Sequence, residues 1–222
     1  MANLTVEKNI SATRLTASTF GVLVGLAGID HGFFEILRGH QPPNEILIEA
    51  IGPAQRFWEY GTEPAVTIIP SYLVSGILSI LIGILVIVWS VAYIDRKYGA
   101  GILMLFCITL FLVGGGFAPI FMAVLGSLTA TRINKPLTFW RKLLPESLRR
   151  FLARIWSVSL IALVILFVIS VEIAIFGWPL TSFMDAETAV NKLYTISYIM
   201  LGLMVLSVLA GFAFDIEHQT EI

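Results

Sequence analysis

The stretch "VGGGFAP", Val113 to Pro119, decides how this chain is threaded, because it lies in the middle of the uncharged segment Tyr98 to Thr131. As one helix that segment would be about 50 Å long, against a bilayer hydrocarbon core of ~30 Å. Glycine and proline each weaken a helix interior. The three consecutive glycines, Gly114 to Gly116, therefore favour a break that makes two short helices out of one long one.

The composition on either side of this segment is that of a membrane protein. Of the 222 residues, 57% are hydrophobic and 13% are charged, and the mean hydropathy is +0.89. Soluble domains carry about 25% charged residues. Thr67 to Ile94 is also uncharged, and Ile155 to Pro179 carries only Glu172. Uncharged runs of about 18 or more residues predict membrane spans, so we expect an all-α polytopic bundle forming a single domain over 1–222.

Basic residues favour six membrane helices over five. Lys and Arg accumulate on the cytoplasmic side of membranes. Arg96 and Lys97 precede the doubtful segment, and Arg132 to Arg154 holds seven of the 14 Lys and Arg residues. A tight or re-entrant hairpin keeps both basic flanks on the cytoplasmic side, whereas a single crossing, the five-helix alternative, separates them. We therefore expect both termini to be cytoplasmic, with spans at about 12–37, 64–94, 98–113, 117–131, 154–177 and 190–214.

The first external loop, between Asp30 and Glu63, is acidic. Within "NEILIEAIG", Asn44 can cap a short amphipathic helical turn, and Pro53 can begin another turn. We expect this loop to lie on the outer interface as a cap; a substrate-gating lid is the alternative.

Charged residues near the end of the first helix are the main candidates for function. Glycines at 21, 25, 28 and 32 form a stripe of the kind that lets membrane helices approach closely. His31 and Glu35 are spaced i, i+4 beside this stripe, so both are expected to face protein, with Asp30 directed elsewhere. Glu172 is the one charged residue in its span, and it lies at a membrane depth similar to that of His31 if the chain has six membrane helices.

These residues predict an intramembrane polar cluster of His31, Glu35 and Glu172, with Asp30, Arg38 and Glu59 as supporting residues. Three interpretations stay open. The cluster is a hydrogen-bonded clasp between helices, or a proton or ion pathway, since intramembrane ionisable groups mark such pathways and histidine titrates near neutrality. The third is a metal site with one imidazole and two carboxylates.

The stretch "HGFFEILRG", His31 to Gly39, resembles the first-helix pattern of the DoxX-like family of small, quinone-associated membrane proteins. In that family a His-Gly pair is followed, four positions after the histidine, by a charged residue. Here that residue is Glu35, where a lysine is usual, and the likeness covers nine residues of 222. The resemblance implies a quinone-linked oxidoreductase subunit.

The basic segment "PESLRRFLAR" predicts a helix that starts at Pro145 and lies on an anionic leaflet through Arg149, Arg150 and Arg154. Docking of a cytosolic partner is the alternative. The net charge of −1 argues against nucleic acid, and the single Cys107, placed mid-span, reads as a small buried residue.

No nucleotide-binding, zinc-protease or nucleophile-elbow motif is present, so ATP-driven transport by this chain alone is not supported and an enzyme is not favoured. The leading hypothesis is a small ion-coupled carrier with its polar site near the outer leaflet. The alternative is an accessory subunit of a membrane complex, including a quinone-linked redox complex.

Overall fold

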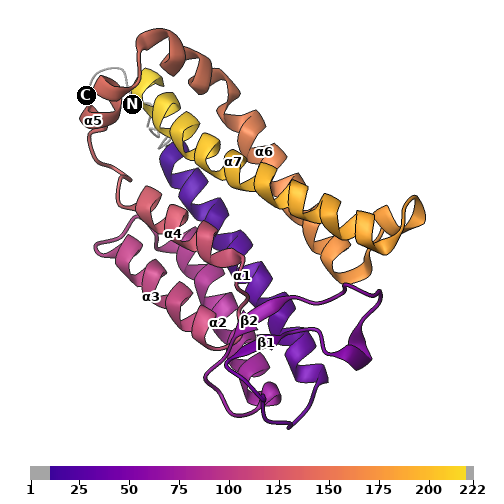
Figure 1. Ribbon diagram of the computed structural model, residues 1–222. Helices are drawn as coiled ribbons and strands as arrows, with labels where there is room; N and C mark the ends of the chain where they lie inside the picture. The colour runs from indigo at the N-terminus through magenta and orange to yellow at the C-terminus, as the bar shows by residue number, and fades with distance from the viewer. Residues whose placement is uncertain (1–10, 219–222) are drawn as a thin grey trace, which may run out of the picture.

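The structure is a computed structural model that describes residues 11–218, and most of these residues are helical (Figure 1). The α-helices are α1 (Ala12–Leu37), α2 (Tyr72–Ala92), α3 (Gly99–Leu112), α4 (Pro119–Ala130), α5 (Thr138–Leu143), α6 (Glu146–Phe176) and α7 (Ala186–His218). Two short 3-10 turns, η1 (Pro53–Gln55) and η2 (Leu180–Ser182), and two strands, β1 (Leu47–Glu49) and β2 (Pro64–Val66), complete the described elements.

Four of the described helices, α1, α2, α6 and α7, are long and apolar enough to cross a membrane, which fits an integral membrane protein. The helices α3 and α4 have 14 and 12 residues, or about 21 Å and 18 Å at ~1.5 Å per residue. Both are shorter than the ~30 Å hydrocarbon core. The all-helical bundle is therefore confirmed, while the number of spans stays a prediction.

The expected break at the three glycines is present. Helix α3 ends at Leu112 and α4 begins at Pro119, so the segment from Tyr98 to Thr131 is a helical hairpin. Gly114 and Gly116 have φ values of +102° and +91°, which residues other than glycine rarely adopt. These backbone angles reverse the chain within the few residues between the two helices.

The glycine stripe of α1 packs against glycines of α2, as the sequence predicted. A Cβ at Gly25 would lie 2.5 Å from Gly83 O, and one at Gly32 would lie 2.6 Å from Gly76 O. The hydroxyl of Ser79 donates to Gly28 O at 2.8 Å. The two helices therefore touch backbone to backbone, a contact that any larger residue would prevent.

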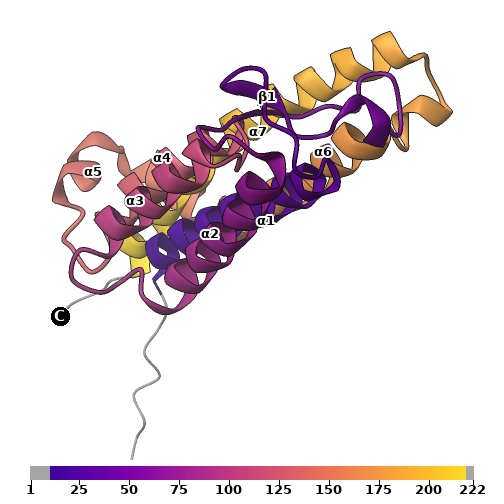
Figure 2. The same cartoon turned by 90° about the horizontal axis from the view of Figure 1, so that it is seen from below.

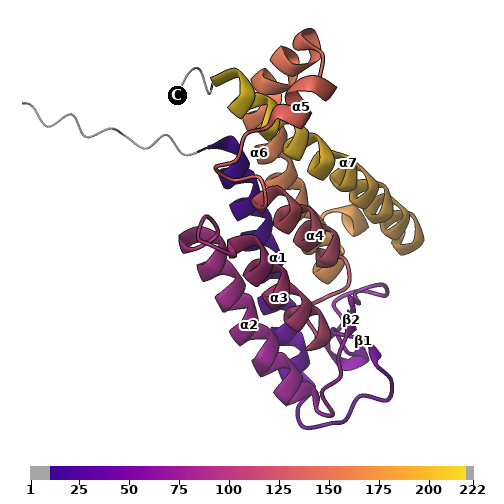
Figure 3. The ribbon, with the colours of Figure 1, turned by 90° about the vertical axis from the view of Figure 1, so that its left-hand side faces the viewer.

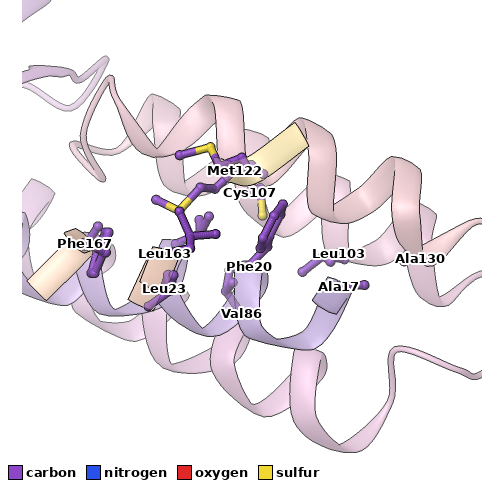
Figure 4. Close-up of a cluster of buried hydrophobic side chains, with 14 of the residues drawn as sticks. Ala17, Phe20, Leu23, Val86, Leu103, Cys107, Met122, Ala130, Leu163 and Phe167 are labelled. Carbon is purple, nitrogen blue, oxygen red and sulfur yellow. The ribbon is translucent and has the colours of Figure 1, made fainter. Parts of the chain in front are cut away.

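A hydrophobic core joins the two groups of helices, α1–α4 on one side and the pair α6 and α7 along their flank (Figures 1 and 3). Phe20 of α1 and Leu163 of α6 are fully buried at its centre (Figure 4). Cys107 of α3 is buried in the same cluster with a free thiol, which confirms its reading as a small core residue.

The N-terminal end of α1 and the C-terminal end of α7 lie together, near α5 and far from the strands (Figures 1 and 2). The carboxylate of Asp215, on α7, accepts hydrogen bonds from Ala12 N at 2.8 Å and Thr13 N at 2.9 Å. Arg14 of α1 lies 3.6 Å from Asp95, which follows α2. Helices α1, α2 and α7 are thus tied at one end.

Three sequence expectations about element boundaries are wrong. The stretch at Asn44 forms strand β1 instead of a helical turn, because Leu47–Glu49 pairs antiparallel with Pro64–Val66. The second long helix therefore begins at Tyr72 and not near residue 64. The basic stretch after Pro145 is continuous with the following span in the 31-residue α6, so it is not a separate helix. The turn at Pro53 is present as η1.

Candidate functional site

The candidate site lies at the C-terminal end of α1, where the α3–α4 turn packs directly on His31 and Glu35. A Cβ at Gly114 would lie 2.1 Å from Glu35 Oε1, and one at Gly116 would lie 2.6 Å from His31 Nε2. The turn can pass this close only because both residues are glycine.

The turn is held in place by the loop between α1 and α2, which carries β1 and β2. Gly114 N donates to Val66 O and Phe117 N donates to Pro64 O, both at 2.9 Å. Buried backbone N–H and C=O groups need such partners, and the turn finds them on the free edge of β2. This pairing fixes the residue just before β2, Glu63, beside α1.

Glu63 is the partner of His31. Glu63 Oε2 lies 2.8 Å from His31 Nε2, and the two side chains are 13% and 7% exposed. The contact is a close histidine–carboxylate pair. Glu63 was not among the residues predicted from the sequence, because the turn and the strand bring the two residues together and no local spacing signals the pair.

Glu35 is the most completely buried ionisable side chain of the site, with 0% exposure. Neither carboxyl oxygen has a hydrogen-bond partner among residues 11–218. The neighbouring hydroxyl of Ser75 is committed elsewhere: it donates to Val113 O at 2.9 Å and lies 2.7 Å from Thr67 Oγ1. An isolated buried carboxylate is costly, and such a group becomes neutral by binding a proton.

A cavity of about 650 Å³ begins at His31 and extends between α1, α4, α6 and α7. One part of its surface, which we call the acidic wall, consists of Asp30, His31, Glu49 and Glu63. Of the described residues that line the cavity, none is Lys or Arg. Another part, which we call the apolar wall, consists of Phe121, Met122, Phe167, Met200, Leu201 and Met204.

The cavity opens to the surface of the bundle beside α4 and α7. Three of its lining residues are also exposed at the surface: Phe121 on α4 at 50%, and Tyr198 and Leu201 on α7 at 76% and 42%. These three residues mark the opening.

The predicted site residues lie in different places. His31 and Glu35 are together under the glycine turn, and Asp30, expected to point elsewhere, lines the same cavity as His31 and lies beside Glu63. Adjacent residues of a helix are only about 100° apart, so one wide cavity can border both.

Within the described part of the chain, no ion pair or hydrogen bond joins the remaining members of the predicted group to His31. Arg38 donates to Glu49 O and its guanidinium lies 3.5 Å from the ring centre of Tyr72, while Glu59 is exposed. Glu172 is on α6 and makes no ion pair or side-chain hydrogen bond within the described part of the chain. Its convergence with His31 and Glu35 stays a prediction.

The basic residues at the start of α6 divide into paired and free positions. Arg149 forms an ion pair with Glu217 of α7, and Arg150 lies 3.2 Å from Glu146. Arg154 is exposed. Contact of this segment with anionic lipid headgroups stays a prediction, with Arg154 and Arg150 the residues best placed for it.

Among residues 11–218 no group of three or more His, Cys, Asp or Glu side chains is arranged to hold a metal ion. The described residues around His31 therefore supply no set of ligands for the metal site that was one of the three interpretations. No protein-family model matches the chain, and searches of curated proteins and of solved structures find no match. The resemblance to the DoxX-like family remains limited to the nine residues from His31 to Gly39.

Proposed function

We propose that this chain is a small proton-coupled carrier whose solute site is the cavity bordered by the acidic wall. One observation carries the proposal: a buried histidine–carboxylate pair, His31 and Glu63, forms part of the wall of a cavity large enough for a small molecule. Ligand pockets have volumes of about 300–1,000 Å³. Ionisable groups inside membrane bundles mark substrate and proton pathways.

The proposed orientation places the acidic wall near the outer leaflet, in six spans with both termini cytoplasmic. Most basic residues lie at the end of the bundle where α1 begins and α7 ends, and such an end is cytoplasmic by the positive-inside rule. These are Arg14, Arg96, Lys97, Arg132, Lys135, Arg141, Lys142, Arg149, Arg150 and Arg154. The loop that carries β1 and β2 is then external.

Coupling arises because a proton and a solute bind different groups, Glu35 and Glu63, that share His31 as a partner. When Glu35 holds a proton, its buried carboxyl needs no counter-charge. When Glu35 loses that proton, His31 is the nearest group on α1 that can balance the charge, and His31 then interacts less with Glu63. A solute that binds Glu63 favours one of these two states, and differential binding of this kind is what couples two sites.

The proposal is tested in proteoliposomes loaded with the pH indicator pyranine. Three probes are added outside in turn: ethidium, anilinonaphthalene sulfonate and the neutral decylubiquinone. A change in internal pH that needs both a probe and the protein supports the proposal, and His31→Ala should abolish it. Protein-free liposomes are the control. If no probe moves protons beyond that control, the carrier proposal is wrong.

The opening between α4 and α7 favours one second candidate, an accessory subunit that receives a helix of a partner protein there. Purification of the intact chain in a mild detergent separates the two. A stoichiometric partner that protects Tyr198→Cys from a maleimide supports the subunit, whereas a lone chain with accessible Tyr198→Cys supports the carrier.

A further inference from the structure

We infer that the cavity binds an amphiphilic organic cation, with its charged group at Asp30 and Glu63 and its apolar body along the apolar wall. The inference rests on the proposed function for the movement of this ligand across the membrane. The binding itself is a separate property of the site and is argued from the charges and shape of the cavity.

The charges of the acidic wall leave an excess of carboxylate. Glu49 is already paired, because its carboxylate lies 2.6 Å from the guanidinium of Arg56. Asp30 and Glu63 lie beside each other and share His31 as their one cationic neighbour on the wall. Two adjacent carboxyl groups repel each other when both are ionised, and either a shared proton or a nearby cation removes that repulsion.

The wall also has an unused hydrogen-bonding atom. His31 is 5% exposed, and its Nδ1 has no hydrogen-bond partner among the described residues. Buried polar atoms of this kind are rare in folded proteins and call for an explanation. Because His31 lines the cavity, a ligand group that displaces its ring slightly can supply the missing partner.

The rest of the cavity suits an apolar body. Met122, Met200 and Met204 are flexible side chains that adapt to different shapes. Phe121 and Tyr198, at the opening, present aromatic rings, whose faces attract organic cations. An anion has few partners here, since Lys and Arg are missing from the lining described above and His31 is already paired with Glu63.

Equilibrium binding to the purified full chain in detergent tests the inference with two probes of the same size and shape but opposite charge. Tetraphenylphosphonium is the cation and tetraphenylborate is the anion, and each is measured by isothermal titration calorimetry. We expect saturable binding of the cation and at least about tenfold weaker binding of the anion, given the interaction of a charge with a nearby carboxylate. Equal affinity for the two probes would overturn the inference.

Substitutions locate the site. Asp30→Asn and Glu63→Gln should each weaken tetraphenylphosphonium binding by about tenfold. The matched control is Glu45→Gln, because Glu45 is an exposed carboxylate of the same loop outside the cavity. A further variant, Met204→Trp, places a larger side chain in the cavity at the apolar wall and should weaken binding of the cation without changing any charge. Binding that Asp30→Asn, Glu63→Gln and Met204→Trp all leave unchanged places the cation elsewhere and refutes the assignment.

Failure of the two proposals gives different results. Saturable cation binding at Asp30 and Glu63 without probe-driven proton movement refutes the carrier and leaves the ligand class standing. Proton movement driven by the anionic or neutral probe alone, with no tetraphenylphosphonium binding, refutes the ligand class and leaves the carrier standing.

Discussion

At the scale of single residues, the side chain with the most unusual surroundings is Glu35. It is fully buried, it has no hydrogen-bond partner within residues 11–218, and Gly114 fills the space in front of it. An ion-paired carboxylate would lose its partner on substitution, and breaking a buried pair costs about 3–5 kcal/mol. A neutral carboxyl without partners loses almost nothing.

We therefore expect the free energy of unfolding of Glu35→Gln to lie within about 1 kcal/mol of the wild-type value, because the amide replaces a neutral group of the same shape. The free energy of unfolding in detergent is the measurement. In proteoliposomes the same variant should lose proton coupling, since an amide cannot exchange the proton. A loss of several kcal/mol in stability would show that Glu35 is charged and paired.

Gly114 makes the second residue-scale prediction. Gly114→Ala should destabilise the fold by about 2 kcal/mol or more, from a left-handed backbone and a Cβ contact of 2.1 Å with Glu35. Gly101→Ala, on α3, is the matched control, because nothing lies within 4 Å of its Cβ. Thermal unfolding of both variants checks this, and equal stability of the two would contradict it.

At the scale of elements, the end of α7 stabilises the start of α1. Asp215 accepts two hydrogen bonds from the first backbone N–H groups of α1, which have no partner within their own helix. Asp215→Ala should cost about 1–3 kcal/mol in the free energy of unfolding. Asp215→Asn should cost less, because its amide oxygen can still accept. Equal losses for the two variants would argue that packing, and not the cap, is responsible.

The residues at the start of α7 are expected to make the stability of the fold depend on pH. Hydrogen bonds from the backbone and hydroxyl of Thr188 lower the pKa of Asp185 below its ordinary value. A carboxyl with a lowered pKa stabilises the fold above its unfolded pKa, about 3.9. That contribution disappears as the pH falls through the folded value. The unfolding temperature of the wild type, measured relative to Asp185→Asn, should therefore decline between about pH 5 and pH 2. A constant difference over this range would exclude the effect.

Sequence patterns identify elements better than they identify the site. Long apolar runs and the glycines predicted α1 with the observed bounds and the break after Leu112, because both depend on local propensity and on the length of a span. They missed β1, since Leu47–Glu49 becomes a strand only by pairing with Pro64–Val66. Glu63 was missed for the same reason, because its partner His31 is 32 positions away in the sequence.

At the scale of the whole molecule, the hairpin of α3 and α4 decides the topology. Its turn is hydrogen-bonded to β2, so the turn lies on the side of the loop between α1 and α2. Its open ends, near Lys97 and Lys135, point toward the basic end of the bundle. Because α3 and α4 are each about 20 Å long, we expect the hairpin either to cross a thinned bilayer or to re-enter it. Both arrangements return the chain to the side from which it came.

Single cysteines introduced into a Cys107→Ala background test this arrangement. Lys97→Cys and Lys135→Cys are exposed positions at the two open ends, and Glu45→Cys is exposed in the loop that contains β1. An impermeant maleimide should label the first two only in inside-out vesicles and the third only in right-side-out vesicles, because basic flanks stay cytoplasmic. Labelling of Lys97→Cys and Lys135→Cys from opposite sides would mean that a single helix crosses there. It would also contradict the hydrogen bond from Gly114 N to Val66 O that places the turn over His31 and Glu35.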